Sequence, residues 1–355
     1  MIFNGERKSF VQQSIEDWGV VGIAALALTG CAERGAGVDD RANGAGGEEF
    51  TITLGHSVAA TAPVNLGSLR FKELVEEKSD GRITVEVFPA EQIGSEPELM
   101  EGLSLGNVQI ALVATAVAAD VCPELGVFAL PYILEGENDR EQYESLRKLT
   151  ASEWNQEAIT KCAEESGNLV IDNSWWYGNR NLTSNVAVNV PADLEGLIIR
   201  TPPADLHTLA IRAFGAEPLP MPFSEVYSAL DTGVIDGQEN PISTIYQNAF
   251  FEVQDFISLT KHMTQNQALV MDVDFFNGLS EEDQELVRSS IDEAGKYQSD
   301  LQLTTNEEEL EKLGTEGMTV VEPDLAPFKA AIEQPVAEFL AALGVDAATI
   351  KEMQQ

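Results

Sequence analysis

The chain has 355 residues, of which 44% are hydrophobic, and this is enough for two domains with packed cores. Asp and Glu number 59 against 21 for Lys and Arg, so the formal net charge is −38. Because nucleic acid and anionic lipid headgroups bind through Lys and Arg, this composition argues against both partners, and an anionic ligand would have to be attracted by a few local arginines.

The N-terminal part contains an apolar run, Gly19–Gly30, which is too short for a membrane span. Its last residues, LTG, precede Cys31 in a pattern that resembles the lipobox of bacterial lipoprotein signal peptides. Acidic residues before the run depart from the positive start of a signal peptide, and a buried apolar segment is the alternative. We expect residues 1–31 to be a lipoprotein signal peptide with Cys31 as the lipidated residue, and the Gly-rich residues 32–49 to be a flexible tether.

The remaining cysteines, Cys122 and Cys162, could form a disulfide or stay as buried thiols, and we favour free thiols. The sequence has three histidines and no CxxC or HExxH motif, so no metal site and no cofactor are expected. It also lacks a GxSxG motif, and its carboxylates form no recognisable catalytic arrangement. We therefore expect a protein that is not an enzyme.

The folded part begins with strands and helices in alternation, which predicts a parallel sheet with helices on both faces. Strands are expected at 50–55, 81–88 and 108–114, and helices at 64–78 and 99–105. Ligands of such sheets bind beyond the carboxyl ends of the strands. The polar residues at those ends are His56, Ser57, Glu91, Gln92, Ser95, Glu96 and Thr115.

A further strand, 169–172, leads into three consecutive aromatic residues, of which at least one is expected to line a cleft. The apolar segments 186–190 and 197–200 are expected to begin a second α/β unit. Arg200 ends the segment 197–200, where its planar fork of donors could clamp a carboxylate. A structural ion pair with a nearby acid is the alternative.

Residues 217–248 contain an apolar helical pattern, a turn and the polar cluster Asp236–Asn240, which is difficult to explain as core. We interpret this stretch as part of a binding surface. Beyond it, strands are expected at 271–276 and 318–321, a long helix that starts after Ser280 at 281–313, and terminal helices at 325–343.

Several motifs resemble the solute-binding proteins of tripartite ATP-independent periplasmic (TRAP) transporters, of the dicarboxylate-binding-protein (DctP) type. The resemblance extends from residue 50 to residue 343, and the motifs are GNRNLTSN (178–185), PADLEGLIIRTP (191–202), FGAEPLPMPFSEVYSALDTGVIDGQENP (214–241) and FFEVQDFISLTKH (250–262). It implies an α/β, two-lobed periplasmic-binding-protein-like fold, each lobe a mixed sheet flanked by helices, with a long hinge-spanning helix. The implied lobes are residues 50–177 with about 266–305, and residues 178–265 with about 306–355.

The resemblance also implies functional residues. Arg200 stands where the family clamps the ligand carboxylate, and Arg180 stands at a second contacting arginine. Asn240 corresponds to a contacting amide and Phe223 to an aromatic that packs on the ligand. Asp236, Gln238 and Glu239 are then expected to brace the turn and the lobe interface.

The ligand is expected to be an organic acid. A carboxylate such as Glu96 in the cleft would disfavour a dicarboxylate, and Trp176 or Tyr177 could pack on a sugar ring, so a uronate or aldonate is favoured. C4-dicarboxylates, aromatic acids, 2-oxo acids and ectoine-like solutes are the alternatives. The remaining predicted contacts are His56, Gln92 and Thr115.

The implied role is extracytoplasmic capture for the membrane subunits of a TRAP permease, by a protein that is monomeric and held to the membrane by lipid only. A ligand-sensing protein with the same lobes is the alternative.

Overall fold

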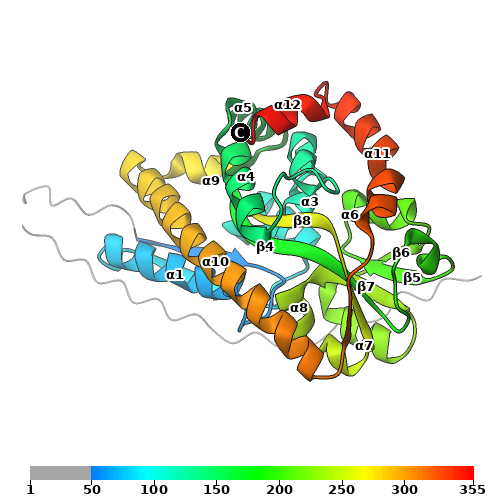
Figure 1. Cartoon of the computed structure of the whole chain (residues 1–355). Helices are drawn as coiled ribbons and strands as arrows, with labels where there is room; N and C mark the ends of the chain where they lie inside the picture. The colour runs from blue at the N-terminus through cyan, green and yellow to red at the C-terminus, as the bar shows by residue number, and fades with distance from the viewer. Residues whose placement is uncertain (1–48) are drawn as a thin grey trace, which may run out of the picture. The chain divides into compact units, whose positions relative to one another are not determined.

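A computed structural model describes residues 49–355, in which one nine-stranded mixed sheet is flanked by helices (Figure 1). The strand order is β2-β1-β3-β8-β4-β7-β5-β6, and β9 pairs with β8. The strands are β1 (Phe50–Gly55), β2 (Ile83–Phe88), β3 (Ile110–Ala114), β4 (Asn168–Ser184), β5 (Ile198–Thr201), β6 (Glu217–Pro220), β7 (Gly237–Pro241), β8 (Phe256–Asp272) and β9 (Thr319–Val321).

The helices alternate with these strands in each half of the sheet. The α-helices are α1 (Pro63–Lys78), α2 (Glu96–Ser104), α3 (Thr115–Ala118), α4 (Asp139–Ala151), α5 (Glu153–Ser166), α6 (Asp205–Ala213), α7 (Val226–Asp231), α8 (Ile242–Gln247), α9 (Val273–Gly278), α10 (Glu281–Thr315), α11 (Leu325–Ala342) and α12 (Ala347–Glu352). The 3-10 helices are η1 (Pro123–Ala129), η2 (Pro191–Leu194), η3 (Phe223–Glu225) and η4 (Phe250–Glu252).

The two halves of the sheet are joined by β4 and β8. Strands β1, β2 and β3 are parallel at one end, and β5, β6 and β7 are parallel at the other. The 17-residue strands β4 and β8 are antiparallel to each other and cross from one half to the other. The expected mixed α/β class is therefore confirmed, and both halves share one continuous hydrogen-bonded sheet.

Helix α10 also connects the halves. It is 35 residues long, which corresponds to about 52 Å, and in Figure 1 it runs from beside α1 to beside α8. Its side chains enter three apolar clusters, with Ile291 in one, Leu303 in the next and Leu313 in the last. Ser280 caps the helix by accepting a hydrogen bond from the Asp283 amide at 3.1 Å, so the predicted start is confirmed.

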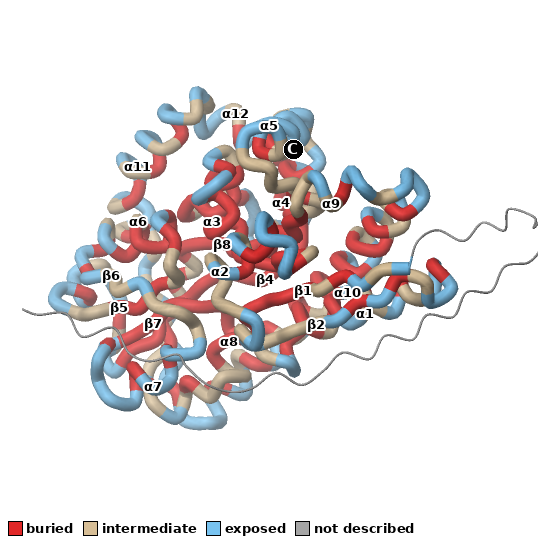
Figure 2. Tube along the Cα trace, turned by 180° about the vertical axis from the view of Figure 1, so that it is seen from behind, coloured by how far each residue is buried: buried red, intermediate tan, exposed pale blue. Residues whose placement is uncertain are grey.

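Burial is concentrated along the central strands. Figure 2 shows β4, β7 and β8 buried along most of their length, whereas α5 and α11 expose their outer faces. The largest apolar cluster surrounds Phe128, Phe214 and Phe328, and a second one, around Phe71 and Trp175, fills the space under α1.

The strand expected at residues 271–276 was wrong. Residues 273–278 form helix α9, because Asp272 accepts a hydrogen bond from the Phe275 amide and caps a helix there. The strand that recrosses between the halves is instead β8, which ends at Asp272. In the second unit, residues 186–190 form no strand and only the segment ending in Arg200 does.

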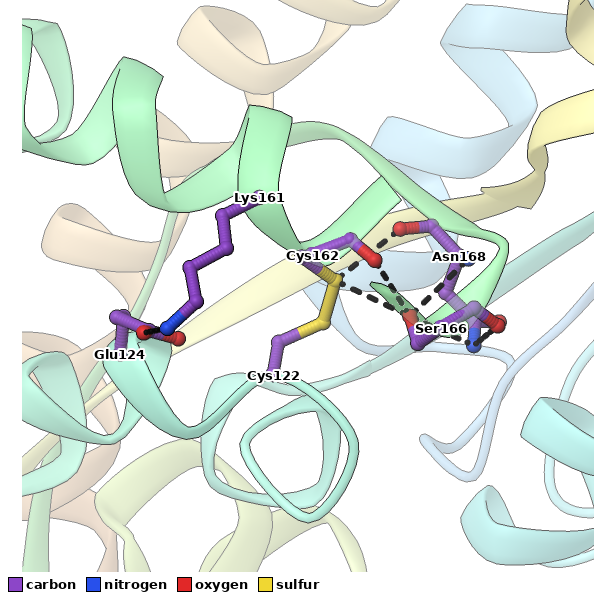
Figure 3. The surroundings of a disulfide bond; sticks show 6 residues. All are labelled: Cys122, Glu124, Lys161, Cys162, Ser166 and Asn168. Atoms are coloured by element: carbon purple, nitrogen blue, oxygen red, sulfur yellow. Dashed lines mark hydrogen bonds and ion pairs between the residues drawn. A yellow bond between two sulfur atoms is a disulfide. The ribbon is translucent and has the colours of Figure 1, made fainter. Parts of the chain in front are cut away.

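The preference for free thiols was also wrong, because Cys122 and Cys162 form a disulfide (Figure 3). Their Cα atoms lie 5.2 Å apart, since the start of η1 packs against α5. The ion pair between Glu124 and Lys161, at 2.5 Å, lies beside the disulfide. Sequence spacing alone could not reveal that these two elements are neighbours.

None of the helices among residues 49–355 is long and apolar enough to cross a membrane. Cys31, and the segments predicted as signal peptide and tether up to residue 48, lie outside the described residues.

Candidate functional site

A pocket lies where the two halves of the sheet face each other, at the carboxyl ends of β1, β2, β3 and β5. This is the edge at which the sequence predicted ligand binding. The first half of the sheet, which contains β1, β2 and β3, contributes Ser57, Val58, Glu91, Ser95, Glu96 and Ala114. The central strands contribute Tyr177, Arg180, Asn240, Gln265 and Gln267, and the second half contributes Arg200, Pro202, Pro203 and Phe223.

Arg200 reaches the pocket from the end of β5 and is only 2% exposed. Its Nε and Nη2 atoms donate to the carbonyl oxygen of Met221 at 3.1 and 2.7 Å. Among residues 49–355 no carboxylate forms an ion pair with Arg200, and its Nη1 atom has no partner. The alternative considered for Arg200, a structural ion pair with a nearby acid, is therefore not found among residues 49–355.

The charge of Arg200 is costly to bury. Desolvation, together with repulsion from Arg180, lowers the pKa of Arg200 to about 10. Glu239, Glu96 and Glu91 partly oppose this effect without contacting the guanidinium, which is still protonated at neutral pH, and an anion in the pocket would supply a direct ion-pair partner.

Arg180 also lines the pocket, but its nitrogen atoms already have protein partners. It forms an ion pair with Glu239 on β7, with one contact at 2.9 Å, and donates to the side chain of Gln265. Burial alone would raise the pKa of Glu239, but Arg180, His207 and His262 outweigh it and hold that pKa well below its usual range. This buried network positions Arg180 at the base of the pocket.

Four of the five residues of the polar cluster at 236–240 are core after all, because residues 237–240 are buried together with their partners, whereas Asp236 is exposed. Gly237–Pro241 forms the fully buried strand β7 between β4 and β5. Gln238 donates to Thr183 at 2.9 Å, and Asn240 donates to Gln238 at 2.5 Å. Only Asn240 of this cluster lines the pocket.

Glu96 lies on the opposite wall, at the first residue of α2. Its Oε1 atom accepts from the Ser57 hydroxyl at 2.6 Å and its Oε2 atom accepts from the Ala114 amide at 3.1 Å. Burial raises the pKa of Glu96, and these two hydrogen bonds oppose the rise. The pocket thus places a carboxylate, which when ionised accepts hydrogen bonds only, across from the two arginines.

Phe223 and Glu91 form the mouth of the pocket. The ring centroid of Phe223 lies 5.6 Å from the guanidinium carbon of Arg200. Glu91, in the loop after β2, accepts hydrogen bonds from the amides of Phe223 and Ser224 at 3.2 and 3.0 Å. This contact joins the two halves across the pocket. Glu91 has a positive φ of 58°, and the preceding Ala90 has 54°.

Tyr177 is the aromatic residue of the WWY run that lines the pocket. Its hydroxyl lies 2.6 Å from the Thr244 hydroxyl, and burial raises its pKa to about 12.

Four predicted contact residues lie outside the pocket lining. Trp176 is fully buried with its ring 6.0 Å from that of Tyr143. His56 is buried beside Asn65 at 3.2 Å, Thr115 donates to the Asn266 carbonyl at 3.1 Å, and Gln92 is exposed.

Sequence reasoning missed the two glutamines of the pocket, Gln265 and Gln267. They are two residues apart on β8, so their side chains share one face of the strand. The alternation in the segment TQNQALV carried this signal, but the segment was not recognised as a continuous strand between the halves. No group of His, Cys, Asp and Glu among residues 49–355 could hold a metal ion.

The arrangement can hold a small anion in a site that is lined mostly by buried residues. Arg200 offers donors to a carboxylate, and Phe223 and Tyr177 offer ring surfaces. Glu96 can accept hydrogen bonds from hydroxyl groups at the other wall.

Comparisons with known proteins show the family of the chain. Residues 54–342 match the family model described as bacterial extracellular solute-binding protein, family 7 (DctP). A solute-binding protein of Roseobacter denitrificans is 35% identical, with 81% of this chain and 86% of the relative aligned. The C4-dicarboxylate-binding periplasmic protein DctP of Rhodobacter capsulatus is 30% identical, with 81% and 84% aligned.

A solved structure is similar as well. It is a TRAP periplasmic solute-binding protein of Roseobacter denitrificans with bound L-galactonate, 32% identical, with a TM-score of 0.77 over 87% of this chain and 99% of that one. The two-lobed fold class expected from the sequence is thereby confirmed.

Proposed function

Because the chain belongs to the bacterial extracellular solute-binding proteins of family 7, which serve TRAP transporters, we propose that it captures a sugar acid outside the cytoplasm and delivers it to a TRAP permease. The observation that carries this proposal is Arg200. A buried guanidinium that has no ion-pair partner among residues 49–355 is strongly stabilised by a ligand carboxylate.

A sugar acid suits the pocket better than a dicarboxylate does. Glu96 can accept hydrogen bonds from hydroxyl groups, whereas when ionised it would repel a second ligand carboxylate. The relative crystallised with L-galactonate supports this class. A C4-dicarboxylate is the second candidate, because the Rhodobacter capsulatus relative is named for that ligand.

We assign ligand contact to the predicted residues that line the pocket. Arg200 would clamp the carboxylate and Arg180 would add a second positive charge, with Asn240, Phe223, Tyr177 and Glu96 contacting the rest of the ligand. Trp176, His56 and Thr115, which are buried outside the lining, would support the walls from behind, and the exposed Gln92 would make no ligand contact.

Capture would require the two lobes to close on the ligand. We keep the lobe bounds expected from the sequence, residues 50–177 with about 266–305 and residues 178–265 with about 306–355. Closure then bends β4, β8 and α10, and Glu91 binds the amides of the other lobe. Small-angle scattering that detects no compaction with the bound sugar acid would argue against closure.

The disulfide supports an extracytoplasmic location, because disulfides persist in oxidising compartments. We propose a monomer tethered by lipid at Cys31, with no catalytic activity. Mass spectrometry of the mature protein would test the lipid, and incubation of the purified protein with its bound acid would reveal any turnover. A gene that lies away from permease genes would favour a sensing role.

A thermal-shift panel of organic acids tests the function directly. It should include L-galactonate, D-galacturonate, succinate, pyruvate and ectoine, followed by calorimetry on any hit. We expect a sugar acid to give the largest shift, and Arg200→Ala to abolish it. A panel in which succinate alone binds would overturn the sugar-acid assignment and keep the clamp.

A further inference from the structure

Gln267 is a buried amide in the pocket without a hydrogen-bond partner. Its side chain lines the pocket and is 1% exposed. Neither its Oε1 nor its Nε2 atom forms a hydrogen bond with any of the residues that the structure describes. Buried polar groups in proteins are nearly always paired, so two unpaired atoms on one pocket side chain point to a ligand.

Gln265, on the same face of the strand, behaves differently. It accepts a hydrogen bond from Arg180, so it belongs to the network that supports the arginines. Gln267 therefore stands out as the amide of β8 that remains available.

The strand register places Gln267 beside Glu96. Gln267 pairs with Ala114 of β3, and the Ala114 amide donates to Glu96 at 3.1 Å. An amide with a free donor and a free acceptor thus adjoins a carboxylate that accepts hydrogen bonds when ionised. Both lie on the first-half side of the pocket.

Arg200 lies toward the other side. In the strand order, β5 is three positions from β8, which corresponds to roughly 14 Å at about 4.8 Å per strand. A ligand whose carboxylate meets Arg200 would extend its far end toward Gln267 and Glu96.

A pair of adjacent hydroxyl groups complements these atoms. The first hydroxyl accepts a hydrogen bond from Nε2 of Gln267 and donates its own hydrogen to Glu96. The second hydroxyl donates to Oε1 of Gln267. A methyl group at this position would leave the amide of Gln267 without hydrogen bonds. A second carboxylate would be repelled by Glu96 when both are ionised.

We propose that Gln267 is the residue that selects a terminal diol, which makes the ligand an open-chain aldonate. This inference rests on the proposed function, because it takes the carboxylate to be clamped by Arg200. It adds a specificity-determining residue and narrows the sugar acids to those that end in two neighbouring hydroxyl groups.

The test compares L-galactonate with L-fuconate, which is the same acid without the terminal hydroxyl. Calorimetry on the full chain should find that the wild type binds L-galactonate at least about tenfold more tightly, because a site built for a hydroxyl is left unpaired by the deoxy analogue. This comparison needs no variant. A wild-type protein that binds both acids equally, or neither, would overturn the proposal.

The variant Gln267→Met keeps the side-chain length and removes both polar atoms. We expect its affinity for L-galactonate to fall about 10- to 100-fold, with less than about a threefold change for L-fuconate, so the preference disappears. Gln267→Leu provides a second apolar replacement if the first is poorly folded. Gln156→Met, at an exposed glutamine of α5, is the matched control and should change neither affinity.

The outcomes separate the two proposals. Retention of the wild-type preference by a folded Gln267→Met protein would overturn the role of Gln267 and leave the proposed function intact. Binding of succinate but of no sugar acid by the wild type would overturn both. The melting temperature of each variant, measured without ligand, shows whether a lost preference reflects the pocket or the fold.

Discussion

Replacement of Arg200 by alanine should weaken binding of the cognate sugar acid more than any other single change in the pocket. Arg200 is 2% exposed and has no ion-pair partner among residues 49–355, so a bound carboxylate would be its main countercharge. Removal of one partner from a desolvated charge pair costs about 2–5 kcal/mol. At about 1.4 kcal/mol per factor of ten, affinity should fall between about 30-fold and several thousand-fold.

Arg200→Lys should fail almost as badly. The guanidinium holds Met221 through Nε and Nη2 and still presents Nη1 to the pocket. A lysine ammonium is a single point of donation and cannot reach the Met221 carbonyl and grip both carboxylate oxygens at once. We therefore expect at least about a tenfold loss of affinity, although the charge is kept.

Isothermal titration at pH 7 measures both variants, with Arg212→Ala, at an exposed arginine on α6, as the control. The melting temperature of Arg200→Ala without ligand should not fall, because a buried charge without an ion-pair partner is removed. Affinity within threefold of the wild type in Arg200→Ala would refute the clamp.

The remaining predictions concern the walls, the closure and the fold. Glu96→Gln should improve succinate binding about tenfold relative to L-galactonate, as measured by calorimetry, because the like charge is gone; unchanged selectivity would contradict this role. Glu91→Ala should raise the ligand dissociation rate about tenfold in stopped flow, with Glu101→Ala on α2 as an exposed control, because two hydrogen bonds between the halves are lost. Reduction of the disulfide, which closes a 40-residue separation, should lower the unfolding free energy by about 4 kcal/mol in urea titrations, and Cys122→Ser with Cys162→Ser should reproduce that loss. Burial lowers the pKa of His56 to about 4, so the unfolded state binds a proton that the folded state does not, and stability present above pH 6.5 is lost as the pH falls; His56→Gln should remove about 2 kcal/mol of the fall between pH 7 and 5.

The sequence predicted those elements whose pattern is local. The alternation at residues 50–55 and the charged helix that follows Ser280 need no knowledge of distant neighbours, and both match the structure. The position of Arg200 at the end of an apolar strand likewise follows from its own segment, and it does line the pocket.

The features that could not be predicted depend on contacts between residues that are distant in sequence. The disulfide requires η1 to meet α5, and the unpaired amide of Gln267 is recognisable only when β8 is paired with β3. Trp176 and Tyr177 are neighbours in sequence, yet only Tyr177 lines the pocket, because successive residues of a strand face opposite sides.

The buried polar strand β7 explains how these parts act together. A strand of the sequence GQENP in the middle of a sheet is unfavourable unless its polar side chains form hydrogen bonds or ion pairs. Here those bonds connect the strand to residues that line the pocket. Glu239 holds Arg180, which repels Arg200 and lowers its pKa, while Asn240 extends the same strand into the pocket. The pocket without a ligand therefore carries two neighbouring arginines and only one of them is neutralised by an ion pair within residues 49–355. A carboxylate supplies the second neutralisation, so binding and the relief of buried charge are one event.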